Sequence, residues 1–373
     1  MRAFLDQQTS PTPCLVIDLP TVRDRYLELV QALPGARLFY AVKANPASEV
    51  VRLLKELGAS FDAASLPEIE LCLAEGVRPE DISYGNTIKK RADVAAAYAL
   101  GVRKFTSDSP ADLENLAVAA PGSSVFCRIM LVGSGAMIPL GQKFGCAPEV
   151  AISLLKSAVD LGLRAAGVSF HVGSQQTDPA AWDGGIAKAA GIAARLADYG
   201  IHLPLLNIGG GLPGPYVPAP PPLADYVTSI SRSVVHHFNT AELPLPGLIL
   251  EPGRFLVADS GLLRAEVVLV TRKSAMDDHR WVYLDCGCYN GMAESGIITY
   301  PMSIPDRDGE TGPVILAGPT CDGDDVMYEC GRYYLPMELQ AGDYIDFLNS
   351  GAYTASFASV GFNGFTPLST HCI

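Results

Sequence analysis

The sequence has no long hydrophobic run, and none of its apolar stretches approaches the roughly 18 residues that span a bilayer. Its first residues, MRAFLDQQTSPTPC, contain no basic start followed by a hydrophobic stretch, which is the pattern of a secretory signal. These two absences predict a protein that makes no membrane contact and works in the cytoplasm.

Positive charge is scarce as well, because 27 Lys and Arg stand against 40 Asp and Glu, for a net charge of −13. Such a surface repels phosphate backbones, so we expect no nucleic-acid partner. The nine cysteines form an odd set, and the only near pair, Cys286 and Cys288, has a single residue between its members. This spacing excludes a disulfide framework and a zinc knuckle, and we expect no metal site.

Hydrophobic residues make up 49% of the 373 residues, which is enough to fill sizeable cores in more than one domain. Amphipathic stretches with apolar residues at helical three-and-four spacing alternate with short strand-like runs. Eight such runs begin near Arg37, Gly58, Ile82, Lys104, Val125, Gly167, Leu205 and Gly247. This alternation predicts an α/β fold with a parallel sheet, and eight units favour closure into a TIM-like (β/α)8 barrel over residues 20–259.

The pattern changes after residue 259, where runs such as LLRAEVVLVTRKS and GPVILAG are strand-like and no long helical stretch separates them. We therefore predict a second, all-β domain formed by residues 1–19 and 260–373, because TPCLVID at 12–18 also has the composition of a strand. The proline-rich segment 213–222 fits either a loop at the barrel mouth or a plain surface connector.

Chemically active residue types follow the expected barrel strands, and the active sites of such barrels lie at the C-terminal strand ends. Lys43 follows the first strand, His171 the sixth and the glycine run Gly209–Gly211 the seventh. Glu251 and Arg254 follow the eighth strand. Each residue alone is more often structural. Together they supply a lysine for a Schiff base, amides for a phosphate and an acid for a pyridinium nitrogen, which is the set that pyridoxal phosphate requires.

Six segments carry a resemblance to a known family: YAVKANP, FHVGSQ, NIGGGLPG, EPGRFLVA, GPTCDGDD and GAYTASFASVGFNGF. In this order they resemble the pyridoxal-phosphate decarboxylases of the alanine-racemase-like barrel class (fold type III), most of all the ornithine decarboxylases, and the resemblance covers nearly the whole chain. It implies a barrel with a β domain and a head-to-tail homodimer whose two active sites are each completed by the partner subunit.

The resemblance also implies a role for each matching residue. The catalytic residues would be Lys43 as the covalent link to the cofactor, Glu251 as partner of the pyridinium nitrogen, His171 stacked on the ring, and Cys321. The cofactor-binding residues would be Lys43, Asp62, Arg128, His171, Ser174, Gly210, Gly211, Glu251, Arg254 and Tyr353.

The resemblance further implies that Cys321 and Asp322 reach the partner's cofactor, where the thiol returns a proton to the substrate and Asp322 pairs with a distal ammonium group. The segment CGCYNGMAESGIITYP lacks the Tyr-Asp pair of eukaryotic members, and its only acid is Glu294, which we expect near the substrate. It also lacks an arginine, the residue with which diaminopimelate decarboxylases hold a distal carboxylate. We therefore expect a decarboxylase of a basic L-amino acid, with L-ornithine, converted to putrescine and CO2, ahead of lysine, arginine and N-substituted diamino acids.

Three alternatives stay open. A diaminopimelate decarboxylase shares the cofactor motifs, and a racemase would need a second base, for which Cys321 is available. A non-catalytic binding protein like the antizyme inhibitors is the third. Joint retention of Lys43, Glu251, Arg254 and Cys321 argues against it.

Overall fold

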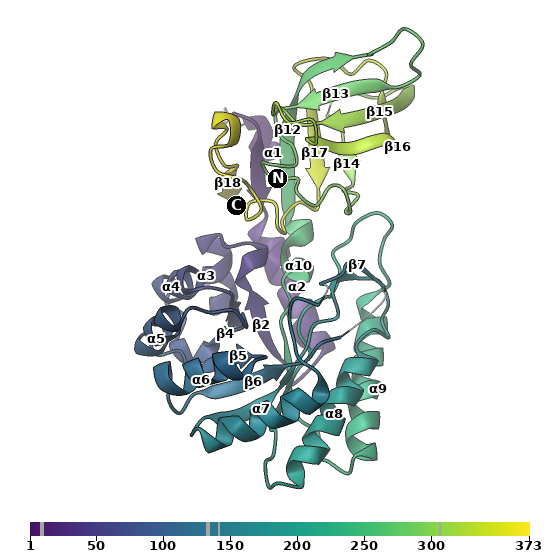
Figure 1. The fold of residues 1–373 in the computed structure, drawn as a ribbon. Helices are drawn as coiled ribbons and strands as arrows, with labels where there is room; N and C mark the ends of the chain where they lie inside the picture. The colour runs from purple at the N-terminus through teal and green to yellow at the C-terminus, as the bar shows by residue number, and fades with distance from the viewer. Residues whose placement is uncertain (8–10, 132–134, 141, 306) are drawn as a thin grey trace. The chain divides into compact units, whose positions relative to one another are not determined.

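The computed structural model describes residues 1–7, 11–131, 135–140, 142–305 and 307–373, which form two compact units (Figure 1). The barrel unit consists of residues 23–213 and 221–255, and the sheet unit of residues 1–22, 214–220 and 256–373. The expected boundaries, 20–259 against 1–19 and 260–373, differ from this division chiefly in the segment 214–220, which groups with the sheet unit.

Eight parallel strands close the barrel, as the strand and helix alternation predicted, and β11 pairs with β2 to complete the ring. The strands are β2 (Arg37–Ala41), β3 (Ser60–Ala63), β4 (Ile82–Tyr84), β5 (Lys104–Ser107), β6 (Ser124–Arg128), β8 (Arg164–Ser169), β10 (Leu205–Asn207) and β11 (Gly247–Leu250). Buried apolar side chains from different strands, among them Phe39, Phe126 and Ile249, pack together inside. The interior is therefore a filled core that leaves the strand ends to carry polar groups.

Helices surround this barrel (Figure 1). They are α2 (Leu19–Ala32), α3 (Ser48–Glu56), α4 (Leu66–Ala74), α5 (Arg91–Ala99), α6 (Pro110–Ala119), α7 (Pro148–Asp160), α8 (Asp183–Ala197) and α9 (Leu223–Thr240). Local sequence sets where they begin: the Ser65 hydroxyl accepts a hydrogen bond from the Glu68 amide at the start of α4, and Ser109 does the same for Asp112 in α6. Two short strands, β7 (Ala136–Ile138) and β9 (Ser174–Gln176), pair beyond the barrel strands.

The sheet unit is built on eight strands: β1 (Cys14–Ile17), β12 (Gly261–Thr271), β13 (Arg280–Leu284), β14 (Met302–Ser303), β15 (Thr311–Ala317), β16 (Val326–Pro336), β17 (Tyr344–Leu348) and β18 (Ser369–Cys372). The expected N-terminal strand is confirmed, because β1 pairs with β12 on one side and with β18 on the other. The unit is mostly sheet rather than all β, since the helix α1 (Arg2–Gln7) precedes β1. Among the described residues, none of the helices has the length and apolar character to span a membrane.

The proline-rich segment 214–220 is anchored within the sheet unit. The Pro215 carbonyl accepts a hydrogen bond from the Asn349 side chain at 2.6 Å, and Val217 forms a β-bridge with Thr299. The buried Tyr216 ring packs edge-on against Tyr300, with 5.2 Å between ring centroids. These contacts show that the segment is more than a solvated connector.

Candidate active site

The barrel unit carries nine of the residues that the sequence predicts for the site, all at or just beyond the C-terminal ends of strands. They are Lys43 after β2, Asp62 in β3, Arg128 at the end of β6, His171 and Ser174 after β8, Gly210 and Gly211 after β10, and Glu251 and Arg254 after β11. Because parallel strands of a closed barrel end at one rim, the fold brings these residues to one face of the unit.

Lys43 and Asp62 form an ion pair, with 3.2 Å between the amine Nζ and the carboxylate Oδ2. The Lys43 side chain stays partly exposed while that of Asp62 is buried. The other carboxylate oxygen of Asp62 is buried and has no hydrogen-bond partner among the described residues. Gly85 makes room for it, since a Cβ at position 85 would lie 1.9 Å from this oxygen.

Glu251 is a buried carboxyl whose Oε1 accepts a hydrogen bond from the Asn207 side-chain amide at 2.5 Å. Burial raises the pKa of Glu251 to about 7, and repulsion from Asp62 adds to this effect. The Asn207 hydrogen bond and the charges of Lys43 and Arg128 act in the opposite direction on the same pKa. A further cation or hydrogen-bond donor next to Glu251 would lower this pKa and leave the carboxyl ionised at neutral pH.

The glycine run after β10 passes close to the other strand ends. A Cβ at Gly210 would lie 2.6 Å from the Glu251 carbonyl oxygen and 3.1 Å from His171 Nε2. Gly209 and Gly211 have φ values of +69° and +113°, which favour glycine. Only a run without side chains fits this path, and the missing side chains leave its backbone amides open to a ligand.

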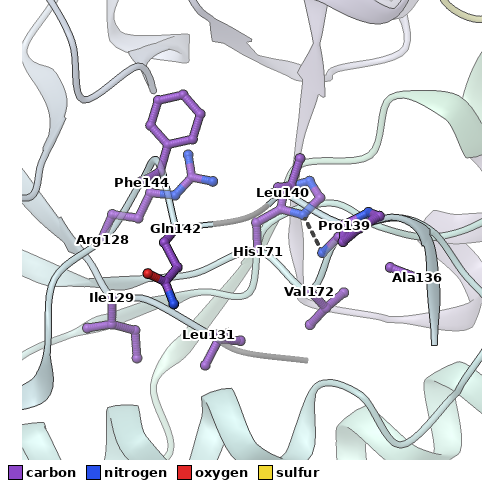
Figure 2. A pocket seen from close by; sticks show the side chains of 11 residues that line it. Arg128, Ile129, Leu131, Ala136, Pro139, Leu140, Gln142, Phe144, His171 and Val172 are labelled. Carbon is purple, nitrogen blue, oxygen red and sulfur yellow. Dashed lines mark hydrogen bonds between the residues drawn. The ribbon is translucent and has the colours of Figure 1, made fainter. Parts of the chain in front are cut away.

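His171 presents a neutral imidazole. Its Nδ1 accepts a hydrogen bond from the Gly173 amide at 3.0 Å, drawn as a dashed line in Figure 2, so the neutral ring carries its proton on Nε2. Burial lowers the pKa of His171 well below its ordinary range, and the positive charges of Arg128 and Lys43 lower it further. A flat, uncharged ring of this kind suits stacking against an aromatic ligand.

A cavity of about 260 Å³ opens beside His171, and Arg128, Gln142 and Phe144 line it as well (Figure 2). The Arg128 guanidinium carbon lies 4.8 Å from the centre of the Phe144 ring. Burial lowers the pKa of Arg128, while the carboxylates of Glu251, Asp62 and Asp108 raise it. The site therefore has one wall that is cationic and aromatic.

Arg254 is buried at the start of α10 (Arg254–Val257) and supplies a second guanidinium. Its Nε and Nη2 donate to the Ser174 hydroxyl at 3.3 and 3.1 Å. A guanidinium and a hydroxyl held together in this way, next to a glycine run, match the donors that bind phosphate.

These groups fit pyridoxal phosphate. The Lys43 amine suits its aldehyde, and the neutral His171 ring suits the face of its ring. The Glu251 carboxyl suits its ring nitrogen, and the Arg254 guanidinium suits its phosphate. The buried oxygen of Asp62 that has no partner among the described residues can accept one further hydrogen bond, from a ligand donor. The residues present therefore offer partners to the aldehyde, the ring nitrogen and the phosphate of the cofactor.

Four predicted residues belong to the sheet unit: Cys321, Asp322, Glu294 and Tyr353. Asp322 is firmly oriented, because its Oδ2 accepts from the Tyr289 hydroxyl at 2.9 Å and its Oδ1 from the Asp324 amide at 3.0 Å. These two hydrogen bonds, that of Asp324 first, hold the pKa of Asp322 below its ordinary value.

Asp325 organises the loop that carries Cys321 and Asp322. This buried carboxylate accepts hydrogen bonds from the Cys288 amide at 2.8 Å and from the Thr320 amide and hydroxyl at 3.1 and 2.7 Å. The Cys321 side chain, in contrast, is exposed. The loop thus presents a thiol and a carboxylate on a fixed backbone.

Glu294 is buried within the sheet unit, and Tyr353 has a φ of +62°, a conformation rare for residues other than glycine. Backbone strain of this kind is often found at functional positions. The parts that Tyr353, Glu294, Cys321 and Asp322 play in the site stay predictions.

Sequence reasoning overlooked Asn207, which contacts Glu251, and Tyr289, which holds Asp322. Both lie inside segments that drew attention for other residues: Asn207 directly precedes IGGG, and Tyr289 lies in CGCYNG. The position of Asn207 at a strand end was an available signal. No comparable signal pointed to Gly85.

Residues 19–258 match the sequence model of the family described as pyridoxal-dependent decarboxylase, pyridoxal binding domain. The chain is 36% identical to a lysine/ornithine decarboxylase of Selenomonas ruminantium over 95% of its length and 88% of the relative's. It is 35% identical to antizyme inhibitor 2 of Xenopus laevis, over 95% of the chain and 80% of the relative. The crystal structure of the lysine/ornithine decarboxylase of Vibrio vulnificus with cadaverine superposes with a TM-score of 0.89 at 32% identity, covering 100% of this chain and 97% of that one.

The chain therefore belongs to the pyridoxal-phosphate-dependent decarboxylases of basic amino acids, which are carboxy-lyases. Family, fold and cofactor all agree with the expectation from the sequence motifs, and the barrel rim holds the groups that the cofactor requires.

Proposed function

We propose that the protein decarboxylates L-ornithine to putrescine and CO2, acting in the cytoplasm as a homodimer whose two sites are shared between subunits. The observation that carries this substrate is the Asp322 carboxylate, which Tyr289 and Asp324 orient within a loop that also carries Cys321. A fixed carboxylate selects an ammonium group at the far end of the substrate.

The barrel residues hold the cofactor in this proposal. Lys43 would hold the cofactor through its aldehyde, His171 would support one face of the ring, and Glu251 would accept a hydrogen bond from the protonated ring nitrogen. Bound pyridoxal phosphate supplies an electron sink that accepts the electron pair of the broken bond to the carboxylate. Asp62 and Arg128 complete the hydrogen bonds around the ring. The phosphate is held by Ser174, Gly210, Gly211, Arg254 and Tyr353.

The sheet-unit residues act on the substrate. The exposed Cys321 thiol donates a proton to the α-carbon after CO2 leaves, and Asp322 binds the distal ammonium. Glu294 lies close to the substrate chain in this scheme. Because the chain's own Cys321 serves the partner's cofactor, each subunit contributes to two sites.

Diaminopimelate is the second candidate substrate, because one arginine does contact the segment 286–301. Arg332 in β16 donates from Nη1 to the Thr299 hydroxyl at 3.0 Å. A guanidinium near this segment would hold a distal carboxylate, which ornithine and lysine lack.

A panel of amino acids scored for CO2 release tests the proposal. We expect L-ornithine to give the highest kcat/KM, followed by L-lysine, with L-arginine below both and meso-diaminopimelate near background. A preference for meso-diaminopimelate would indicate that Arg332, and not Asp322, contacts the distal end of the substrate. Conversion of L-ornithine to its enantiomer without CO2 would indicate a racemase, and no turnover of any substrate would indicate a binding protein.

A further inference from the structure

Asn207 is a buried polar residue to which the scheme above gives no role. It ends β10, where its backbone is fixed in register with Ser169 of β8 and Ile249 of β11. Both polar atoms of its side chain are used: Nδ2 donates to Glu251 Oε1 at 2.5 Å, and Oδ1 accepts from the Gly209 amide at 2.9 Å. One rigid amide therefore joins two parts of the cofactor site.

The orientation of this amide follows from its partners. The Gly209 backbone N–H can only donate, so the side-chain oxygen of Asn207 must face it, and the NH2 group is left facing Glu251. An amide turned the other way would set two donors against each other at Gly209 and two acceptors against each other at Glu251. The chemistry of both neighbours thus sets the asparagine amide in this one orientation.

We propose that Asn207 is a positioning residue that ties the Glu251 carboxylate to the glycine run, so that the cofactor's ring-nitrogen contact and its phosphate contact keep one fixed separation. This inference rests on the proposed role of Glu251 as partner of the ring nitrogen. It adds that Asn207 stabilises the ionised form of Glu251 by donating to it, since a hydrogen bond to the charged form favours that form.

Aspartate at this position would have the same shape and would still accept from Gly209, but it would set a second carboxylate against Glu251. Two carboxylates so close cannot both be ionised, so the pair would share a proton. The other groups that act on Glu251 are the negative Asp62 and the positive Lys43 and Arg128. In an Asn207→Asp variant at low pH, a proton shared by the two carboxyl groups provides one hydrogen-bond donor between them. At higher pH that proton is lost, and the two carboxylates repel each other.

Titration of the apoprotein with pyridoxal phosphate, followed by absorbance at pH 6 and pH 8, tests the inference. Asn86→Asp is a matched control: Asn86 Oδ1 accepts from the Ile88 amide at 3.0 Å, as in Asn207, but its Nδ2 donates to the Ala64 carbonyl at 3.1 Å instead of to a carboxylate. We expect Asn207→Asp to weaken cofactor binding by about 10-fold or more at pH 8, the effect of losing a hydrogen bond to a charged group, and by clearly less at pH 6. Asn86→Asp should stay within about twofold of the wild type at both pH values, which is below the effect of such a bond.

A double variant keeps the test decisive if Asn207→Asp folds poorly. Asn207→Asp with Glu251→Gln exchanges the amide and the carboxylate and restores a hydrogen bond between the two positions. It should regain thermal stability and bind the cofactor no better than Glu251→Gln alone.

Three outcomes would overturn the inference. In the first, Asn207→Asp binds the cofactor as tightly as the wild type at both pH values, while Glu251→Gln binds it more weakly. This result would remove the role of Asn207 and leave that of Glu251 in place. In the second, Asn207→Asp and Asn86→Asp lose cofactor affinity equally and at both pH values. This result would show that Asn207 is only a structural residue. Unchanged affinity in Glu251→Gln would instead refute the proposed role of Glu251, and this inference with it.

Discussion

The Lys43 amine lies 3.2 Å from one carboxylate oxygen of Asp62, whose other oxygen is buried without a hydrogen-bond partner among the described residues. The ion pair holds the amine at the barrel rim, and Gly85 is what allows the carboxylate to lie there. One carboxylate oxygen holds the lysine amine, and the second can accept a hydrogen bond from a ligand. This arrangement suits an amine that bonds to a cofactor and later releases it.

Lys43 is therefore the predicted point of covalent attachment. Borohydride reduction of the holoenzyme followed by peptide mapping should place the pyridoxyl label on the peptide containing Lys43. Lys43→Ala should lose the label and the activity together. A label on any other lysine, Lys89 included, would show that the attachment site is assigned wrongly.

The raised pKa of Glu251 predicts how the stability of the apoprotein depends on pH. Its pKa is about 7 in the folded protein against an ordinary 4.5, so between these pH values the folded state holds a proton that the unfolded state has lost. The stabilisation that Glu251 contributes should therefore fall as pH rises through this window, by at most roughly 3 kcal/mol.

Urea unfolding of the apoprotein at pH 5 and pH 8 measures this effect. Glu251→Gln has no carboxyl to titrate, so the stability of the wild type relative to this variant should fall from pH 5 to pH 8. Identical pH dependence in the two proteins would contradict the assignment of Glu251 as the buried group that titrates.

Gly210 should tolerate no side chain, because a Cβ would lie 2.6 Å from the backbone carbonyl oxygen of Glu251. Gly210→Ala should therefore shift the glycine run and weaken cofactor binding by at least about tenfold, the loss of one charge-assisted hydrogen bond to the phosphate. The control is Gly191→Ala in α8, where no atom beyond the local helix backbone lies within 4 Å of the added Cβ and the helix gains up to about 1 kcal/mol. Equal cofactor affinity in the two variants would show that the glycine run does not hold the phosphate.

Most of the fold could be predicted from the sequence because it follows from local patterns. The apolar spacing of the helices and the short strands between them determine a closed barrel, and a barrel determines which strand ends meet. The sequence alone was therefore enough to group Lys43, His171 and Glu251 at one rim. It did not predict the extra helix α1 or the anchoring of segment 214–220 to the sheet unit, since both depend on packing in three dimensions.

The partners of the site residues were also beyond sequence reasoning. Asn207 and Glu251 are 44 residues apart, and Tyr289 and Asp322 are 33 apart, so each hydrogen bond depends on strand register and loop path rather than on local spacing. Residue types pointed to the chemistry of the site, whereas its hydrogen bonds needed the structure.

The shared site is tested by mixing two inactive variants. If Lys43 and Cys321 of different subunits form one site, Lys43→Ala mixed with Cys321→Ala should regain activity, because each heterodimer has one intact site. Random exchange makes half of the dimers heterodimers, so the recovered activity should approach a quarter of the wild-type value. Mass measurement of the mixed dimers shows whether subunits have exchanged. If they have exchanged and activity still does not recover, the sites are not shared.

The most direct test of the account is the kcat/KM for L-ornithine in Asp322→Asn, compared with Asp324→Asn. Asp324 holds Asp322 through its backbone amide, so its substitution removes one negative charge from the same loop and leaves that hydrogen bond in place. We predict a loss of roughly 10- to 100-fold in Asp322→Asn, the value of a charge-assisted hydrogen bond, with unchanged cofactor absorbance, and a change within about twofold in Asp324→Asn. Unchanged kcat/KM for L-ornithine in Asp322→Asn would contradict the claim that this carboxylate selects a basic amino acid.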